Sequence, residues 1–482
     1  MNTLVQDKIL RQLRNGKPIN SEMIEELLSD YTSIATKTEA LWKRYLGDAP
    51  ILKRTVPEYV ASNERLANDF FGLVVNNKVG YFSGIPINYS IDKTKYEINE
   101  EPSTENQIPH VRYKAHTNTV NEFILRNNMH DLDSEMVKIL AATGYGVRKY
   151  YTDKQGNTRT VNLKPFEVIV LSNEHKEVEY ALRFFKSYNS NDEEVTYIEF
   201  YDESSITYFV ENSSKDKGDS KYILNSEYAT NPQEHVFDYC PFVYFQNNEE
   251  SMSDVEKVLP LIDSYNTVLS NNNNELNGFA LAYMYLKNGK LTPELVANLK
   301  QLGALEIPEG AELGYLTKTL DATFGDSFLD RVQDNIFQFT QSVNFNDEKF
   351  NSTSGIALKY KLQALNDKCI ALEAKFKRSL AEQFKIITSA WQKIGIPIDY
   401  LDIYYTFKRN VPPDLEYEAN VAQKLKGIVS HETILNTLSF IDDPDFELLA
   451  LEKEMGTVQL TNPNTPINEQ YNLNNVPVGD AE

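Results

Sequence analysis

The sequence predicts an α+β fold that is divided into two or more domains. Apolar residues recur with helical spacing toward both ends of the chain, whereas residues 144–245 between them alternate with a period of two. The 482 residues exceed a single ordinary hydrophobic core. A hydrophobic fraction of 41% with 11% aromatic residues is typical of a folded protein.

The N-terminal part is predicted to be helical. Residues 4–14 form a helix that Asn15-Gly16 ends, and residues 21–46 form a second helix with Ser21 as its N-cap. After a linker that contains Gly and Pro, residues 58–79 are expected to form an amphipathic helix with one apolar face, made of Leu66, Phe70, Leu73 and Val74. A charged loop over 93–109 precedes two further helices, at 112–127 and 131–143.

The period-two stretch from Gly144 to Phe245 predicts an antiparallel β region of several hairpins with one solvated face. Turn residues lie at 154–157 and around Lys217-Gly218.

A third section predicts two helices on either side of a small α/β module. Ser253 and Glu256 form a capping box for a helix over 253–277, in which we expect Pro260 to produce a kink. The second helix, over 326–343, has an apolar stripe of Leu329, Val332, Ile336, Phe339 and Val343. Between them lie a turn at Asn288-Gly289, a short helix that begins at Thr292-Pro293, and three strands with the sequences FALAYMYL, ALEIP and ELGYLTK.

The stretch "NFNDEKFNSTSGIALKYKLQALNDK", residues 344–368, passes from a polar loop into a long helix. Gly355–Lys393 contains no proline and repeats apolar residues every three or four positions, which predicts one helix of about 40 residues and roughly 60 Å. We expect a strand over about 398–409, two or three acidic helices after it, and a disordered tail at 457–482.

The charge is strongly acidic and unevenly distributed. The formal charge is −22, so the chain lacks the basic surface of a protein that grips nucleic acid tightly, although DNA can lie near it without adhering. Residues 410–482 hold 13 acids and 3 bases, and residues 355–394 hold 3 acids and 8 bases. Two cysteines, Cys240 and Cys369, are too few for a disulfide framework and indicate a reducing compartment. We find no apolar run for a membrane span and no signal peptide.

Motifs for enzymatic chemistry are missing. The six histidines are scattered without a metal-ligand pattern, and the Gly-Lys pairs at 16–17 and 289–290 lack the other residues of a phosphate loop. There is no G-x-S-x-G, and Asp442-Asp443 next to Pro444 is typical of a solvated turn. We therefore expect no catalytic residue, no metal site and no cofactor.

Five stretches in order resemble portal proteins of tailed bacteriophages, in the branch common among long-tailed phages of Gram-positive hosts. They are VVNNKVGYFSGIPI (74–87), NNEESMSDVEKVLPLIDSYNTVLSNNNNEL (247–276), NSTSGIALKYKL (351–362), FKRNVPPD (407–414) and KLKGIVSHETILNTLSFIDDPDFEL (424–448). With the segments between them, they cover roughly residues 40 to 455.

The resemblance implies a dodecameric homo-oligomeric ring at one capsid vertex of the virion, assembled in the host cytoplasm, through which double-stranded DNA is packaged and ejected. It divides the chain into a wing (1–252), a stem helix (253–277), a clip (278–322), a second stem helix (323–343), a tunnel loop (344–354), a spine helix with a returning strand (355–411), a crown (412–456) and the tail. We expect the spine helix to pack between subunits through Leu365, Leu372 and Phe376.

The resemblance also implies sites and partners. The tunnel loop places these residues against DNA: Asn346, Asp347, Glu348, Lys349, Asn351 and Ser352. The clip offers Glu294, Asn298 and Lys300 for docking. The implied partners are terminase, a head-completion or adaptor protein, the scaffold and the major capsid protein.

Two other interpretations remain open. One is an oligomeric ring or adaptor of a phage-like particle that does not conduct DNA, which electron microscopy combined with a packaging assay would distinguish. The other is a DNA-processing enzyme, against which the missing metal and phosphate-loop motifs count.

Overall fold

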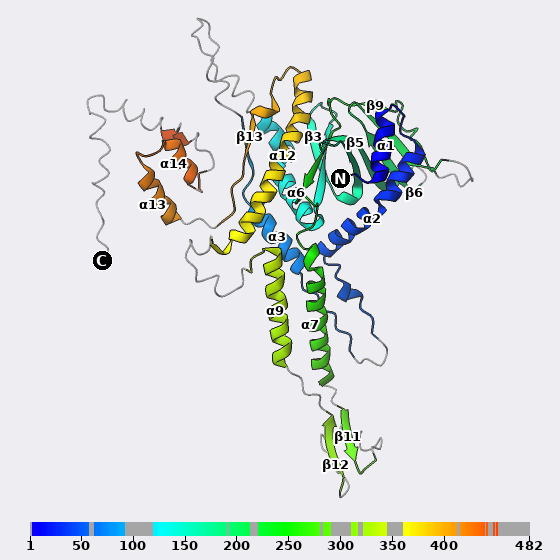
Figure 1. Ribbon diagram of the computed structural model, residues 1–482, viewed down its shortest axis with the longest axis vertical. Helices are drawn as coiled ribbons and strands as arrows, with labels where there is room; N and C mark the ends of the chain where they lie inside the picture. The colour runs from blue at the N-terminus through cyan, green and yellow to red at the C-terminus, as the bar shows by residue number, and fades with distance from the viewer. Residues whose placement is uncertain are drawn as a thin grey trace. The chain divides into compact units, whose positions relative to one another are not determined.

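Figure 1 shows the computed structural model of the chain, in which helices and strands are both abundant, as predicted. The chain divides into two compact units, Met1–Asn410 and Val411–Glu482. The structure describes residues 2–56, 62–91, 119–189, 192–212, 220–279, 283–290, 310–316, 322–344, 360–411, 415–438, 440–441, 447–448 and 450–451.

The two predicted N-terminal helices are present as α1 (Leu4–Arg14) and α2 (Ser21–Tyr45). Asn15 and Gly16, with φ of 79° at the glycine, end α1 as expected. The prediction of Ser21 as N-cap is wrong, because the side chain of Asn20 accepts the N–H of Met23. Ser21 instead accepts a hydrogen bond of 3.0 Å from the N–H of Tyr222, a tertiary contact.

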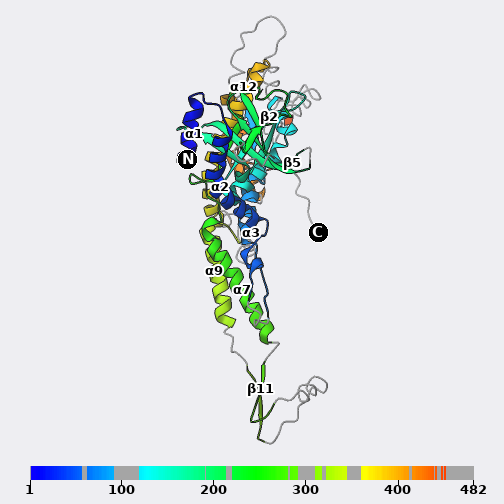
Figure 2. The same cartoon turned by 90° about the vertical axis from the view of Figure 1, so that its right-hand side faces the viewer.

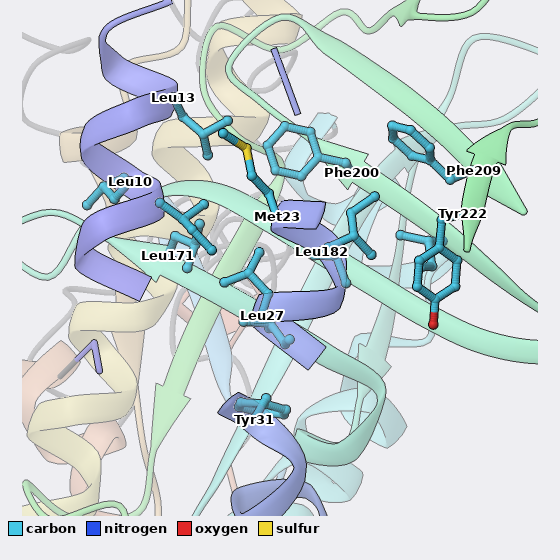
Figure 3. Close-up of a cluster of buried hydrophobic side chains, with 14 residues drawn as sticks. Leu10, Leu13, Met23, Leu27, Tyr31, Leu171, Leu182, Phe200, Phe209 and Tyr222 are labelled. Atoms are coloured by element: carbon cyan, nitrogen blue, oxygen red, sulfur yellow. The ribbon is translucent and has the colours of Figure 1, made fainter. Parts of the chain in front are cut away.

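Helices α1 and α2 cover one face of the larger sheet. Its strands run β4-β5-β6-β7-β8, all antiparallel, with β9 paired to β7. The apolar residues on this face alternate along the strands and pack against the helices, as Figure 3 shows for Leu171, Leu182 and Phe200. The bounds are β4 (Val168–Ser172), β5 (Val178–Tyr188), β6 (Glu194–Tyr201), β7 (Ser205–Glu211), β8 (Tyr222–Leu224) and β9 (Gln233–Glu234).

A second antiparallel sheet, in the order β10-β2-β3, completes the predicted β region. Its strands are β10 (Phe242–Gln246), β2 (Tyr145–Thr152) and β3 (Thr158–Leu163). Helix α6 (Met129–Thr143) leads into β2 through Gly144, whose φ is 95°. Residues 119–126 are helical, in agreement with the predicted helix over 112–127 as far as it is described.

Of the helix predicted over 58–79, residues 58–61 lie outside the described residues, residues 62–69 are not helical, and α3 (Phe70–Ser83) forms the rest. Asp69 caps it by accepting the N–H of Gly72 at 2.7 Å. Residues 62–69 are not helical because their backbone N–H groups bind side chains of another helix: Glu64, Leu66 and Asn68 donate to Asn274, Ser270 and Asn266. The predicted apolar face is also incorrect at Leu73, which is exposed.

That other helix is α7 (Leu259–Phe279), which follows a 3-10 turn at Glu256–Val258. Pro260 lies in its first turn, where no N–H is needed, so the predicted kink is wrong. The capping box is wrong too, since Ser253 accepts from Val255 and donates to the carbonyl of Ala141. Figures 1 and 2 both show α7 beside α9 (Ala322–Thr340), and the two pack together.

On α9 the stripe of Leu329, Val332 and Ile336 is buried as predicted, but Phe339 is exposed and Phe337 is buried in its place. Of the predicted module, the structure describes an antiparallel pair, β11 (Tyr283–Lys287) and β12 (Glu312–Leu316), with Asn288 at a positive φ of 59° in the expected turn. The strand ALEIP lies outside the described residues.

The long helix is α12 (Gln363–Lys393), 31 residues in which the predicted stripe from Leu365 to Trp391 is buried. Residues 355–359 lie outside the described part, and Leu362 precedes the helix as its N-cap. Strand β13 (Ile403–Thr406), after a 3-10 turn at Tyr400–Asp402, pairs with β1 (Asn88–Ile91). Further 3-10 turns are Pro50–Lys53 and Pro165–Glu167.

The expectation that Phe376 packs between subunits is wrong. Its ring lies 5.0 Å from that of Phe245 and 6.0 Å from those of Phe82 and Phe407, all in the same chain. Leu365 and Leu372 are likewise buried within the chain. The second unit contains two of the predicted acidic helices, α13 (Leu415–Leu425) and α14 (His431–Thr437), which pack against each other.

Candidate functional site

The predicted site residues lie outside the described residues. This holds for the tunnel-loop residues Asn346, Asp347, Glu348, Lys349, Asn351 and Ser352, and for the clip residues Glu294, Asn298 and Lys300. The structure does describe the chain on both sides of the predicted loop, up to Asn344 and again from Tyr360. The candidate site is therefore built from the groups that hold these two flanks.

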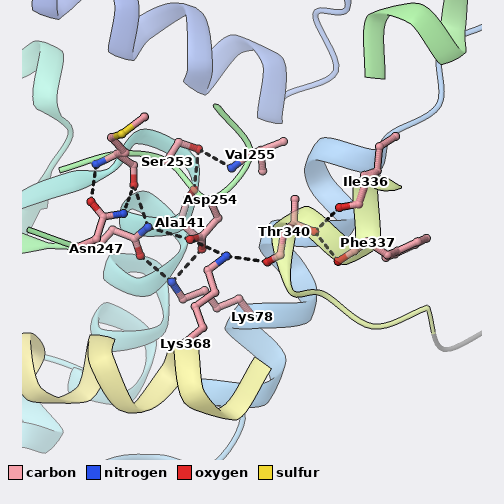
Figure 4. Close-up of polar contacts among 12 residues, drawn as sticks. Lys78, Ala141, Asn247, Ser253, Asp254, Val255, Ile336, Phe337, Thr340 and Lys368 are labelled. Atoms are coloured by element: carbon pink, nitrogen blue, oxygen red, sulfur yellow. Dashed lines mark hydrogen bonds and ion pairs between the residues drawn. The ribbon is translucent and has the colours of Figure 1, made fainter. Parts of the chain in front are cut away.

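The central feature is a buried cluster of two lysines and one aspartate, drawn in Figure 4. The carboxylate of Asp254 accepts from Lys78 Nζ and from Lys368 Nζ, each at 2.8 Å. The side chains of Lys78 and Asp254 are only 3% and 2% exposed, and that of Lys368 is 19% exposed. We call Lys78, Asp254 and Lys368 the lysine–aspartate cluster.

The three charged groups come from distant parts of the chain. Lys78 is on α3, Lys368 is on α12, and Asp254 lies in the turn that leads into α7. The turn is fixed by the N–H of Asp254, which donates to the carbonyl of Ala141 at 3.0 Å. Asn247 completes the cluster: its amide donates to Asp254 at 3.0 Å and its Oδ1 accepts from Lys78 at 2.6 Å.

The cluster keeps its carboxylate charged. Burial alone would raise the pKa of Asp254, but the positive charges and hydrogen bonds of Lys78 and Lys368 outweigh it, and the pKa lies below its ordinary value. Burial and the neighbouring charge of Lys78 lower the pKa of Lys368, an effect that Asp254 opposes. Each charged group of the cluster needs its partners, because an unpaired charge that is buried here would destabilise the fold.

Contacts from the same region hold the flanks of the predicted loop. Lys368 Nζ donates at 2.9 Å to the carbonyl oxygen of Thr340, the last residue of α9. Asn77 Nδ2 donates to Ser342 Oγ at 3.0 Å and to the carbonyl of Val343 at 2.9 Å. On the other flank, the hydroxyl of Tyr81 donates to Asn366 Oδ1 at 3.3 Å.

Helix α9, which leads into the predicted loop, exposes a row of carboxylates. Asp326, Asp330 and Asp334 recur every four residues, so they share one side of the helix, and all three are exposed. A row of this kind repels a polyanion.

A groove of about 1750 Å³ lies between α1, β5 and α12, and several of its charged side chains pair with each other, as Arg14 does with Glu179 and Lys385 with Glu177. Within the described ranges, no three His, Cys, Asp or Glu side chains gather closely enough to hold a metal ion. Of the helices in the described part, none has the length and apolar character to span a membrane.

Sequence reasoning missed the lysine–aspartate cluster. A signal was present at Lys78, which shares the buried side of α3 with Val74, Val75 and Phe82 and is thus a charged residue in an apolar pattern. Lys368 likewise lies next to Cys369 on α12. The sequence offered no means of linking either lysine to Asp254, which is more than a hundred residues from both.

Comparisons with known proteins agree on one family. The family model described as "Phage portal protein, SPP1 Gp6-like" matches residues 24–459. The portal protein of Bacillus phage SPP1 is 25% identical over 414 residues, which cover 82% of this chain and 76% of that protein. The portal protein of Clostridium phage phiCD119 is 25% identical over 416 residues, which cover 82% of this chain and 85% of that protein.

Proposed function

This chain belongs to the family of SPP1 Gp6-like phage portal proteins, and we propose that it closes into a dodecameric ring whose channel carries double-stranded DNA during packaging and ejection. A role in DNA packaging follows from the family, whose members are virion components that form an oligomeric ring at the capsid. The number of subunits, the path of the DNA and the individual partners belong to the proposal.

The observation that carries the proposal is the acidic charge of α9. If this helix lines the channel, Asp326, Asp330 and Asp334 of every subunit face the DNA in successive rings of carboxylates. A net charge of −22 per chain also disfavours tight binding of DNA. DNA that must slide through a channel has to be kept from binding to its wall, and phosphate groups bind tightly where basic side chains neutralise them.

The tunnel loop 344–354 then provides the weaker contacts. Lys349 is its one basic residue, next to Asp347 and Glu348, and Asn346, Asn351 and Ser352 are neutral polar groups. One lysine among acids and amides allows a transient contact with a phosphate without forming a strong site.

The proposed partners are those that the division of the chain into clip, stem and tunnel loop implies. The clip, with Glu294, Asn298 and Lys300, docks terminase during packaging and a head-completion or adaptor protein afterwards. The scaffold and the major capsid protein surround the ring during assembly in the host cytoplasm. The chain itself is not an enzyme, and terminase supplies the energy for DNA movement.

Charge reversal in the loop tests the channel. We would assemble procapsids with D347K/E348K and measure the packaged DNA length at low and high salt, with D347N/E348Q as the matched control. Each reversal adds two positive units, so DNA should bind the loop and packaging should stop early, with partial relief at high salt. The neutral control should package nearly as the wild type does.

The same experiment separates the alternative function. A ring or adaptor that does not conduct DNA would form normally with either variant and would show no salt-dependent packaging defect. If D347K/E348K packaged DNA at low salt as the wild type does, the tunnel loop would not contact the DNA during packaging.

A further inference from the structure

We propose that Lys368 and Asn77 are positioning residues that fix the point where the chain leaves α9. Both side chains reach the end of this helix from other elements, Lys368 from α12 and Asn77 from α3. Neither is close to a predicted channel residue in the sequence. The functional meaning of this role rests on the proposed function, because residue 344 begins the predicted tunnel loop.

The end of α9 has a conformation that usually requires glycine. Gln341, the first residue after the helix, has a φ of 56°, in the left-handed region that side chains disfavour. Its N–H donates to the carbonyl of Gln338, and the next N–H, of Ser342, donates to that of Phe337. These two bonds form a Schellman motif built on glutamine. The motif alone is thus poorly stabilised and benefits from support by other parts of the fold.

Lys368 provides the first support. The carbonyl of Thr340 has no partner within α9, because the last carbonyls of a helix lack the N–H groups of a following turn. Lys368 supplies that partner at 2.9 Å, and its charge lies at the negative end of the helix dipole. Figure 4 shows the ammonium group between Thr340 and Asp254.

The charge balance of the lysine–aspartate cluster explains why this contact is specific. Two ammonium groups share the one carboxylate of Asp254, so Asp254 alone does not balance both. Lys78 has Asn247 Oδ1 as its second acceptor, and Lys368 has the Thr340 carbonyl. If the end of α9 moved away, Lys368 would keep only a shared carboxylate. The position of α9 and the charge balance of the cluster are therefore coupled.

Asn77 provides the second support, one step further along the chain. Its amide donates to both Ser342 and Val343, so it holds the backbone after the helix has ended. Asn77 and Lys78 are adjacent on α3, and Tyr81, one turn later, reaches Asn366 on α12. One helix thus contacts the chain on both sides of the segment 345–359.

Hydrogen–deuterium exchange on the full-length assembled protein tests the proposal. The amides of Gln341 and Ser342 report the end of α9, and those of strand β10 report the core. K368M leaves the pair of Lys78 with Asp254 intact, so the fold should persist. K368M and N77A should each speed exchange at Gln341 and Ser342 by about tenfold, with β10 unchanged.

Three further variants sharpen the test. K377M, on the exposed side of the same helix, should change nothing at these amides. K368R retains a donor and should restore much of the protection. Q341G places glycine where the left-handed conformation favours it, so K368M/Q341G should exchange more slowly than K368M. Unchanged exchange in both K368M and N77A, or an equal increase over the whole protein in both, would overturn the proposal.

Packaging by K368M procapsids separates this role from that of the channel. Faster exchange at Gln341 and Ser342 together with a reduced packaged DNA length would support both the positioning role and the contact of the tunnel loop with DNA. Local loosening with normal packaging supports the positioning role and counts against the tunnel loop, which D347K/E348K examines independently.

Discussion

The guanidinium of Arg148 on β2 donates at 2.9 Å to the carboxylate of Asp133 on α6, and the two side chains are 0% and 3% exposed. The same guanidinium reaches Gln383 on α12 at 2.9 Å, and Asp133 also accepts from the hydroxyl of Tyr89 on β1. One buried ion pair therefore joins four elements: α6 and β2, which are adjacent in the sequence, and the distant β1 and α12. Removal of this ion pair should therefore destabilise the whole first unit.

The first prediction concerns this pair. D133A leaves the Arg148 charge buried without a carboxylate and should lower the free energy of unfolding by about 3–5 kcal/mol. Urea denaturation would measure it. As a control, K186M breaks the exposed pair of Lys186 with Glu194, 72% and 54% exposed, and should lower the free energy of unfolding far less than D133A does. Equal effects of the two changes would contradict the assignment.

The second prediction ranks changes in the lysine–aspartate cluster. D254N leaves two buried ammonium groups without a carboxylate and should lower the free energy of unfolding by about 3–5 kcal/mol. K368M should cost less, because Asp254 keeps Lys78. Thermal unfolding of both variants at equal protein concentration shows which of them is less stable. A larger loss of stability in K368M than in D254N would contradict the central role of the Asp254 carboxylate in the cluster.

The third prediction separates folding from assembly at Phe376, which is 1% exposed within the chain. F376A should leave a cavity and cost about 3–5 kcal/mol, with an unfolding midpoint that does not depend on ring formation. F339A is the control, because this side chain on α9 is 63% exposed in the single chain. Denaturation of unassembled protein should show a loss for F376A and almost none for F339A.

The fourth prediction concerns pH. Hydrogen bonds from Lys176 and Lys375, and then their charges, hold the pKa of Glu249 at about 2, below the ordinary 4.5. Because the folded-state pKa is the lower one, the stabilisation is complete above about 4.5 and is lost as the pH falls toward 2. The difference in urea midpoint between wild type and E249Q should shrink over this range and should also decrease with salt. If the difference in urea midpoint did not change with pH, the ion pairs of Glu249 would not be its source.

The fifth prediction concerns the backbone bonds to α7. Ser270 accepts the N–H of Leu66 at 2.9 Å, and Asn266 accepts that of Asn68 at 2.8 Å. S270A leaves a donor without its acceptor, which should cost about 1–3 kcal/mol and speed exchange at Leu66. The exposed Thr267, which bonds only within its own helix to Asp263, provides the control T267A. Similar exchange at Leu66 in both variants would refute this account.

The elements whose pattern is local were predictable from the amino-acid sequence. The apolar spacing of α1, α2 and α12 and the alternation along β2 to β10 are produced by burial of one face, and that face repeats with the period of the element. Five family-like stretches in order also sufficed to indicate a portal protein, which the family match confirmed.

Features that depend on partners far along the chain became visible only in the folded structure. Residues 62–69 have a helical pattern but are not helical, because side chains of α7 take up their N–H groups. An apolar stripe shows that a face is buried but not against what, so Phe376 was assigned to a neighbouring subunit although its partners are Phe82, Phe245 and Phe407.

The lysine–aspartate cluster has the same origin. A single lysine in an apolar pattern shows that a counter-charge must exist, but not which of the 70 acidic residues supplies it. Only the fold brings Asp254 between Lys78 and Lys368, because electrostatic pairing depends on distance in space and carries no period along the sequence.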